Sequence, residues 1–511
     1  MGRINTNVQS LLAQRVLGTN NRSLGTALER LSTGLRISRG QDDPAGLIAS
    51  ENLRVEQRGL NEAIKNADRA DQVMNIAEGG LQEVSGLLLE LQGIVTATAS
   101  KAGQSSEERA ANQLQVDSIL QTIDRLSNST NFQGIKLLNG NLDFRTSGVA
   151  TGVSDIRIGA AKYTGSSLNV DVLVTTSAQQ AGLFLSAGGA AIDLNTGSSL
   201  VFEIAGVKGS RELSFSSGTT IAKMVDAINT FTDVTGLVAT VSGTGILVKS
   251  SEYGSGEFVS VKVVNDAGIN STNNGANAAT RGVYNRIATS FNSNHTTIAS
   301  TFANATNPVR DLGQDVRATV NGYQAIATGK KLKVNTDFLD AEFVLSAAKA
   351  QALGSVGGSN AAFTITGGGA EFQLASKVDI GAKATIGLQN IAVRELGDSV
   401  SGYLSSLGSG GANNMANGNI DNAQKVVAAA VKQIASMRGR LGNFQRNVLG
   451  ATVRSLSTTA ENTAAATSVI RDADFATETA ALTRSQILVN ASTNVLSYAN
   501  QAPNSALQLL G

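Results

Sequence analysis

Residues 60–95, LNEAIKNADRADQVMNIAEGGLQEVSGLLLELQGIV, decide the fold. Their apolar residues recur at alternating steps of three and four, which places them along one side of an α-helix. Residues 420–451 repeat this pattern near the other end of the chain. We therefore predict two long helices that pack against each other within the chain. Their seam comprises Leu60, Met74, Leu81, Val84, Leu88, Leu91 and Val95 on the first helix, and Ile420, Val427, Ile434, Leu441, Phe444 and Val448 on the second.

A second set of apolar residues lies outside this seam. Residues 1–35 and a last helix that begins near residue 475 have apolar stripes with Asn, Gln, Ser and Thr between them, so neither helix is expected to be stable alone. Pro503 is expected to end the last helix. Other apolar residues widen one flank of residues 60–95 and indicate a second neighbour. The predicted subunit-assembly residues are Leu24, Leu28, Leu31, Leu35, Val73, Leu87, Ile94, Phe475, Leu482, Val489 and Leu496.

Helix boundaries near the amino terminus carry clear signals. Asp43 precedes Pro44, an arrangement typical of a helix cap followed by the first helical residue, and no further proline occurs before about Ala99. Ser105 and Glu108 have the spacing of a capping box. They predict a shorter helix whose buried stripe contains Leu114, Ile119, Ile123 and Leu126, and residues 130–140 after it predict a β-hairpin.

The centre of the chain has a different character. Between about residues 150 and 405, short Val, Ile, Leu, Phe and Thr segments alternate with Gly, Ser, Asn and Asp turns, which predicts a mostly β insertion. Residues 221–231 predict one helix within it. Residues 265–282 are the expected boundary between two lobes, or equally a surface loop. The glycine-rich residues 408–418 are expected to be a flexible return to the second long helix.

The predicted fold class is therefore α+β, with long antiparallel helices from both termini and a mostly β insertion. The predicted domains are residues 1–43 with 468–511 as a helical inner core, residues 44–150 with 406–467 as a helical rod with a hairpin, and residues 151–405 as the outer insertion.

Composition argues against several function classes. The 511 residues contain no Cys, no Trp and one His, and the net charge is +1. Metal sites, thiol chemistry and His-based acid/base catalysis therefore lack most of their usual side chains, and we expect no enzyme activity, cofactor or metal. His295 stands among Asn, Ser and Thr and is expected to be a solvated loop residue. The charge balance gives no general attraction for nucleic acid, and no apolar run is long enough for membrane insertion.

Sequence motifs at both ends of the chain resemble those of one family. Leu31-Ser-Thr-Gly-Leu-Arg-Ile37 followed by Asp42-Asp43-Pro-Ala-Gly46 is similar to the amino-terminal signature of bacterial flagellins. Ile470 to Glu478, Ser485 to Thr493, and Ala499-Asn-Gln-Ala-Pro503 with Leu507 to Leu510 resemble the carboxy-terminal signature. Residues 219–264 resemble the small repeat that is inserted in many flagellins. The match covers about 140 residues at the start and about 110 at the end.

The resemblance implies an extracellular structural subunit that polymerises with itself into the flagellar filament for motility. It also implies export as an unfolded chain without a cleaved signal peptide, an export chaperone on the carboxy-terminal helices, and contacts with filament cap and hook-associated proteins. A hook-filament junction protein, or an adhesin carried on a flagellin-like stem, is the alternative. From the residues alone, the weak terminal helices indicate folding that is coupled to assembly.

One segment departs from the family pattern. In the stretch that the vertebrate innate receptor recognises in the family, an Arg with a following Leu makes the contact. Here the corresponding residues 89–94 contain no Arg: Leu89 takes its place, and Gly93 takes the place of the Leu. Gln115 stands where an acidic partner is usual. We expect weak or no receptor agonism.

Overall fold

The computed structural model describes residues 6–100, 103–187, 191–194, 197–243, 245–269, 281–285, 298–358, 361–416 and 418–508. The chain forms two compact units. The first unit comprises Met1–Gln72, Phe372–Ala384 and Asn443–Gly511, and the second comprises Val73–Glu371 and Thr385–Gly442. Long helices from both ends and a β-rich insertion between them confirm the predicted α+β class.

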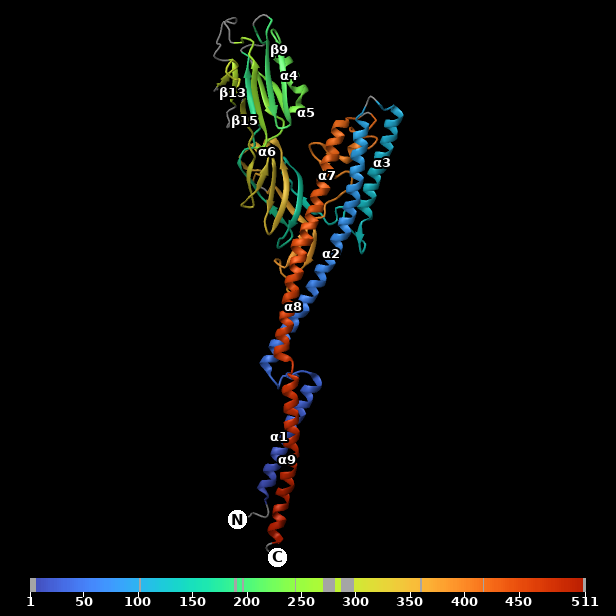
Figure 1. Cartoon of the computed structure of the whole chain (residues 1–511), viewed down its shortest axis with the longest axis vertical. Coiled ribbons are helices and arrows are strands. Elements are labelled where there is room, and N and C mark those ends of the chain that lie inside the picture. The colour runs from blue at the N-terminus through green and yellow to red at the C-terminus, as the bar shows by residue number, and fades with distance from the viewer. Residues whose placement is uncertain are drawn as a thin grey trace. The chain divides into compact units, whose positions relative to one another are not determined.

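In the first unit, helices α1 (Val8–Thr33) and α9 (Phe475–Gln508) lie side by side in opposite directions (Figure 1). Asn7 caps the start of α1 by accepting a hydrogen bond from the Ser10 N–H at 3.0 Å. Gly34 ends the helix in the left-handed conformation, with φ of 69°, which glycine adopts without strain. Helix α9 continues past Pro503, so the prediction that this proline ends the helix is wrong. A proline removes one N–H donor, but a helix can continue across it.

Helix α2 (Pro44–Thr98) begins and ends close to its predicted limits. The Asp43 carboxylate accepts a hydrogen bond from the Gly46 N–H at 2.9 Å, as expected for a cap. In the first unit, α2 packs against α8 (Gly450–Arg471), where Leu60, Ala63 and Leu456 form a buried cluster. The predicted pairing of the two long helices is present here.

A hairpin of the predicted insertion belongs to the first unit instead. Strands β23 (Ala370–Gln373) and β24 (Lys383–Ile386) pair, and the segment between them packs on α2. The Asn66 amide donates to the Gln373 carbonyl at 3.4 Å. A Cβ atom at Gly59 would lie 2.8 Å from the Ser376 Cβ, so this close approach requires glycine.

In the second unit, α7 (Ile420–Asn443) lies along the later part of α2, and Arg438 pairs with Glu78 at 2.7 Å. Helix α3 (Ser106–Ser129) begins with the predicted capping box, both hydrogen bonds of which are present. Its buried side differs from the prediction, because Leu114 is 70% exposed and Val116, Leu120 and Gln113 are buried with Ile119 and Ile123. Strands β1 (Asn131–Phe132) and β2 (Ile135–Lys136) form the predicted hairpin.

The insertion contains two hydrophobic cores. Lobe A is the core between residues 181 and 309, with a five-stranded sheet, a four-stranded sheet and α4 (Ile221–Thr230) packed together. The first sheet has the order β10 (Leu237–Ser242), β11 (Gly245–Ser250), β7 (Gly182–Ser186), β13 (Gly282–Asn285), β14 (Ile298–Thr301). The second has the order β15 (Val309–Leu312), β12 (Phe258–Asn265), β8 (Ser199–Gly206), β9 (Gly209–Ser216). The short helix α5 (Thr232–Thr235) follows α4.

Lobe B is the core formed by residues 144–178 and 316–365. Its first sheet has the strand order β17 (Tyr323–Gln324), β16 (Arg317–Val320), β6 (Val172–Thr176), β21 (Gly354–Ser355). The second has the order β18 (Ile326–Thr328), β19 (Lys331–Asn335), β20 (Leu339–Leu345), β4 (Val153–Ala161). The third has the order β3 (Phe144–Ser147), β22 (Phe363–Gly368), β5 (Leu168–Val170). Helix α6 (Ala347–Gln351) follows β20. Outside this lobe lie β25 (Gly397–Asp398), β26 (Gly402–Tyr403) and the 3-10 helix η3 (Leu404–Leu407).

The boundary between the lobes is not where the sequence predicted it. Val263 and Ala267 on one side of residues 270–280, and Val283 on the other, belong to the same core of lobe A. The chain passes between the lobes near residues 178–181 and again near residues 309–316, where each crossing is short. The asparagine- and glycine-rich composition of residues 265–282 therefore does not mark a lobe boundary, and residues 270–280 lie outside the described part.

The glycine-rich return to α7 is fixed to α3. The Gln113 amide donates to the Leu407 carbonyl at 2.9 Å and accepts from the Met415 N–H at 2.6 Å. The Asp117 carboxylate accepts from the Ser409 N–H at 3.0 Å, and Met415 is only 1% exposed. The expectation of a flexible return is therefore wrong for its described residues, because polar side chains of α3 satisfy its backbone groups.

Candidate assembly surface

The facing sides of α1 and α9 consist of small and polar residues. The buried positions of α9 are Glu478, Ser485, Ser492 and Ala499, seven residues apart. Those of α1 are Ser10, Ala13 and Ala27. Such side chains let the two helices approach closely but bury little apolar surface, so the pair gains little hydrophobic stabilisation from its own contact.

Hydrogen bonds made by side chains tie the pair together instead. The Asn7 amide donates to the Ala499 carbonyl, the Ser10 hydroxyl donates to the Asn500 side chain, and the Asn20 amide donates to the Ser492 hydroxyl, each at 2.7 Å. Each of these bonds contributes a net 0.5–1.5 kcal/mol, roughly, and fixes the alignment of the two helices.

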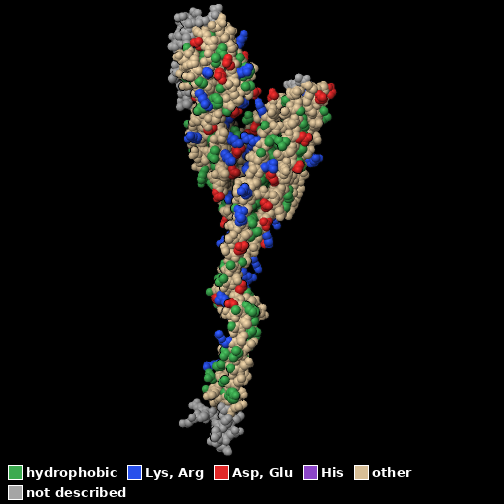
Figure 2. All heavy atoms as spheres, viewed as in Figure 1, with side chains coloured by type: hydrophobic (Ala, Val, Ile, Leu, Met, Phe, Trp, Pro, Cys, Tyr) green, Lys and Arg blue, Asp and Glu red, His purple; other side chains and the backbone are tan. Residues whose placement is uncertain are grey.

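The large apolar side chains of the pair lie outside this contact. Leu12 is 51%, Ile487 62% and Tyr498 74% exposed. Between the helices runs an apolar groove of about 650 Å³ lined by Gln9, Leu12, Ala13, Val16, Asn20, Leu488, Ala491, Ser492, Val495, Tyr498 and Ala499. Figure 2 shows hydrophobic side chains gathered over this part of the helix pair. A contiguous apolar surface of this kind marks an interaction site.

The predicted assembly residues divide into three groups. Leu28 and Phe475 are exposed, at 48% and 71%. The half-buried residues are Leu24, Leu31, Leu35, Leu482, Val489 and Leu496 on the terminal segments, and Leu87 and Ile94 on α2. Val73 is 7% exposed and is covered within the chain, so the prediction that it is left for a neighbour is wrong. The buried side of α2 is wider at this point than the regular seam.

The predicted assembly set omitted most of the exposed large apolar residues of the pair. These are Val8, Leu11, Leu12, Val16, Ile487, Leu488, Val495 and Tyr498. In α9 the predicted seven-residue interval through Leu482, Val489 and Leu496 marks a half-buried side, and the exposed residues lie beside it. The available signal was the presence of further apolar residues beside the predicted stripe, since apolar residues that the chain does not cover are left for a partner.

The long-helix seam lies largely where it was predicted. The seam residues of α2 are 0–4% exposed, and Ile420, Val427, Ile434, Leu441 and Phe444 are also buried. Val448 is only half-buried, and Leu449 takes the seam position with 2% exposure. The reason is a π-helical turn, η4 (Phe444–Leu449), which shifts the buried side of the helix by one residue.

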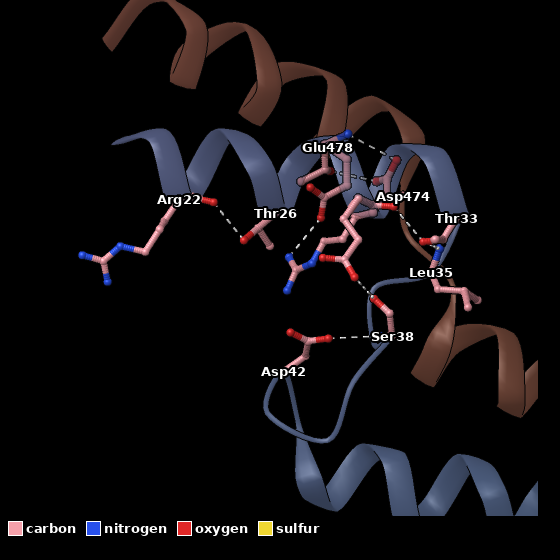
Figure 3. A network of polar contacts seen from close by, with 11 residues as sticks. Arg22, Thr26, Thr33, Leu35, Ser38, Asp42, Asp474 and Glu478 are labelled. Atoms are coloured by element: carbon pink, nitrogen blue, oxygen red, sulfur yellow. Dashed lines mark hydrogen bonds and ion pairs between the residues drawn. The ribbon is translucent and has the colours of Figure 1, made fainter. Parts of the chain in front are cut away.

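A polar network holds the joint between α1, α9 and the start of α2 (Figure 3). Arg30 of α1 pairs with Glu478 of α9 at 3.2 Å. The Asp42 carboxylate accepts the backbone N–H groups of Ser38 at 3.1 Å and Arg39 at 2.8 Å. Asp474 caps α9 by accepting the Ala476 N–H at 2.9 Å and the Thr477 hydroxyl at 2.9 Å.

These hydrogen bonds favour the ionised carboxylates of the joint. The backbone N–H of Arg39 holds the pKa of Asp42 below its ordinary value, and the Thr477 hydroxyl does the same for the pKa of Asp474. Glu51 of α2 has a lowered pKa because Arg54 donates to it at 2.6 Å, and Arg471 of α8 also pairs with it at 2.9 Å. The joint is therefore held most firmly when these acids are charged.

A carboxylate of the second unit behaves in the opposite way. Burial raises the pKa of Asp143 to about 6, and hydrogen bonding from Phe144 and the charge of Arg440 offset this only in part. Burial likewise raises the pKa of Asp340, which also faces Arg440. The raised pKa of Asp143 makes the stability of the second unit sensitive to pH around 6.

No candidate metal or membrane site appears among the described residues. No group of three or more His, Cys, Asp and Glu side chains in that part of the chain is placed to hold a metal ion. No described helix combines the length and the hydropathy that a membrane span needs. His295 lies outside the described residues.

Family models match the helical regions at both ends of the chain. Residues 4–143 match the family model described as the bacterial flagellin N-terminal helical region, and residues 424–510 match the bacterial flagellin C-terminal helical region. Residues 199–252, within lobe A, match the flagellin hook IN motif.

Similar whole chains include the flagellin of Salmonella choleraesuis (strain SC-B67), 28% identical over 535 residues, and flagellin A of Helicobacter pylori (strain ATCC 700392 / 26695), 27% identical over 535 residues. Each comparison covers 99% of both chains. Among solved structures, FliC from Burkholderia pseudomallei is 12% identical with a TM-score of 0.23, covering 74% of this chain and 98% of that chain. The flagellar cap protein FliD (D1-D2-D3 domains) from Escherichia coli is 16% identical with a TM-score of 0.27, covering 49% and 63%. On the family matches at both ends and the full-length similarity, the chain belongs to the bacterial flagellin family.

Proposed function

We propose that this chain is a structural subunit that polymerises into the flagellar filament and that its terminal helices complete their folding on assembly. The observation that carries the proposal is the α1–α9 pair, which buries small and polar residues within the chain and leaves its large apolar residues outside. Neighbouring copies of the chain in the filament would cover them.

The free energies favour folding on assembly over folding alone. Fully burying a Leu or Ile side chain contributes about 1.5–3 kcal/mol, whereas ordering each backbone residue costs about 1–2 kcal/mol. The contact between α1 and α9 offers few such side chains, so the pair in a free monomer is marginal. A growing filament end supplies the missing apolar contact.

Hydrogen exchange and electron microscopy test this proposal together. Amides of residues 8–33 and 475–501 should exchange rapidly in the monomer and slowly in the filament, and equal protection in both states would contradict the proposal. Microscopy of purified protein with and without seed filaments should show elongated filaments. A product that only caps the seeds would favour a hook-filament junction protein.

A matched pair of substitutions tests the surface itself. Ile487→Asp in α9 should abolish elongation and leave the thermal unfolding of the monomer unchanged, because Ile487 is 62% exposed. Ile326→Asp introduces the same charge in lobe B at a side chain that is 71% exposed, and it should leave elongation intact. Loss of elongation in both variants would show that the effect is not specific to the helix pair.

The flank of α2 is proposed as a further subunit contact. Leu87 and Ile94 are half-buried, which leaves part of each side chain available to a neighbour. Leu87→Asp or Ile94→Asp should therefore impair polymerisation more than monomer folding. Loss of the monomer fold without a separate effect on polymerisation would assign both residues to the interior.

The domain division and the further partners remain part of the proposal. Residues 1–43 with 468–511 would form the inner core of the filament, the long helices a surrounding layer, and the two lobes the outer part. An export chaperone would hold the carboxy-terminal helices before export of the unfolded chain, consistent with the exposed apolar residues of α9. Chaperone binding should be lost on deletion of residues 475–501, and retention would exclude this site.

We also propose weak or no recognition by the vertebrate innate receptor. Leu89 is 59% exposed at the position where the family pattern has an Arg, so an apolar side chain replaces a charged one on the surface. A cell reporter should respond weakly to the monomer, and Leu89→Arg should raise the response. A wild-type response at the potency of a typical agonist flagellin would refute the proposal.

A further inference from the structure

The long carboxy-terminal helix contains one irregular step in its buried side. From Ile420 through Met437 and Leu441 to Phe444, buried residues follow each other at steps of three and four. The next buried residue is Leu449, five positions after Phe444. Buried Leu456 and Thr463 and half-buried Val453 and Ala460 then resume steps of three and four.

Helix α2 has no such step. Its buried residues run from Leu60 to Val95 at three and four without interruption, and it is α-helical throughout. An α-helix turns by about 100° per residue, so five residues advance about 140° beyond one full turn. A regular helix would therefore turn Leu449 and Leu456 away from α2 and would place Thr452, Ser455 and Thr459 against it.

The π-helical turn η4 removes this conflict. The Gly450 N–H donates to the Gln445 carbonyl, five residues earlier, so the turn contains one residue more than an α-turn. Two contacts surround the irregular turn: the Phe444 ring lies 6.3 Å from the Phe372 ring of the β23–β24 hairpin, and the Gln445 amide donates to Asp71 at 3.1 Å.

We propose that η4 keeps the apolar sides of α7 and α8 on α2. The step from Phe444 to Leu449 is one residue longer than the seam allows in a regular α-helix, and the wider π-helical turn accommodates that extra residue. The extra residue is confined to residues 445–448, between the seam residues Phe444 and Leu449 at the two ends of η4. Removal of one residue there converts η4 into an ordinary α-turn and leaves the seam intact.

Single-residue deletions test this directly in the full chain. Deletion of exposed Asn447 should keep the midpoint of thermal unfolding, followed by circular dichroism at 222 nm, within about 2 °C of the wild type. Deletion of exposed Thr458, in the regular part of α8, should lower that midpoint by more than about 5 °C or abolish the cooperative transition. Equal losses in both variants, or tolerance of both, would overturn the proposal.

A substitution pair tests the same proposal without changing the chain length. Leu449→Ala should lower the unfolding midpoint more than Val448→Ala, because η4 places Leu449 rather than Val448 in the seam. The reverse order would mean that the helix is regular in solution, and it would overturn the proposal. Insertion of one Ala between Arg446 and Asn447 should be as harmful as deletion of Thr458.

Discussion

The α1–α9 pair and lobe B bury their surfaces in different ways. The pair buries Ser10, Ser485 and Ser492 within the chain and exposes Leu12 and Ile487. Lobe B does the reverse, with strand β20 alternating buried and half-buried residues over a core that contains Phe343 and Phe363. Lobe B therefore buries its apolar residues within a single chain, whereas the α1–α9 pair leaves its large apolar residues for an interface with another chain.

The largest expected effect is a core truncation in lobe B. Phe343 is fully buried, with its ring 5.6 Å from that of Phe363, so Phe343→Ala should lower the free energy of unfolding of the lobe by about 3–5 kcal/mol. Calorimetry of the monomer measures this change. Ile326→Ala, at an exposed position of the same lobe, should change it by less than about 0.5 kcal/mol. Similar effects of both would mean that lobe B is not packed as described.

A seam truncation should have the next largest effect. Leu60 of α2 is 4% exposed and packs with Ala63 and Leu456, so Leu60→Ala should destabilise the long helices by about 2–4 kcal/mol in helical circular dichroism. Leu11→Ala in α1 removes a side chain that is 58% exposed and should leave the monomer unchanged. A large monomer effect of Leu11→Ala would show that the monomer itself covers this side chain.

The two regions should also differ in their pH dependence. Because the pKa of Asp143 is raised to about 6 in the folded state, its contribution to stability is present at low pH and is lost as the pH rises through about 6. The lowered pKa values of Asp42, Glu51 and Asp474 act in the opposite sense, so the joint loses stability as the pH falls.

Asp143→Asn isolates the first of these effects. The variant should remove a decline of about 2–3 kcal/mol in the unfolding free energy of the second unit between pH 4 and pH 7. Chemical denaturation at several pH values measures it. An unchanged pH profile in the variant would assign the dependence to another group.

The smallest expected effect is the loss of a helix cap. Ser105 accepts the Glu108 N–H at 3.2 Å, and Ser105→Ala should cost about 1 kcal/mol of α3 stability, seen as faster amide exchange in the first turn. Glu107→Ala at the neighbouring exposed position should have a smaller effect, since the Ser105–Glu108 box remains. Unchanged exchange in Ser105→Ala would show that the return segment on α3, and not the cap, fixes this end.

Periodicity predicted the elements that local physics decides. The limits of α2, the cap at Asp43, the capping box at Ser105 and the seam from Leu60 to Val95 all follow from spacing and side-chain chemistry. The helix predicted at residues 221–231 is also present, as α4. Each of these features depends on residues that are close in sequence.

The errors arose where distant residues compete for one surface. Spacing alone selected Val448, because it cannot reveal that η4 moves Leu449 into the seam. Composition alone placed a lobe boundary at residues 265–282, because it cannot reveal that Val263 and Val283 share a core. The glycine-rich return looked flexible because its partners, Gln113 and Asp117, lie almost 300 residues earlier.

By itself, the sequence determined the fold class, the long helices, their caps and the family resemblance, since helical periodicity and the signatures at both ends are local properties. Only the tertiary structure decided which side of α1 and α9 is hidden within the chain. A helix presents all of its sides equally until a partner covers one, and here hydrogen-bonded small residues face that partner. The larger residues are thereby left for assembly.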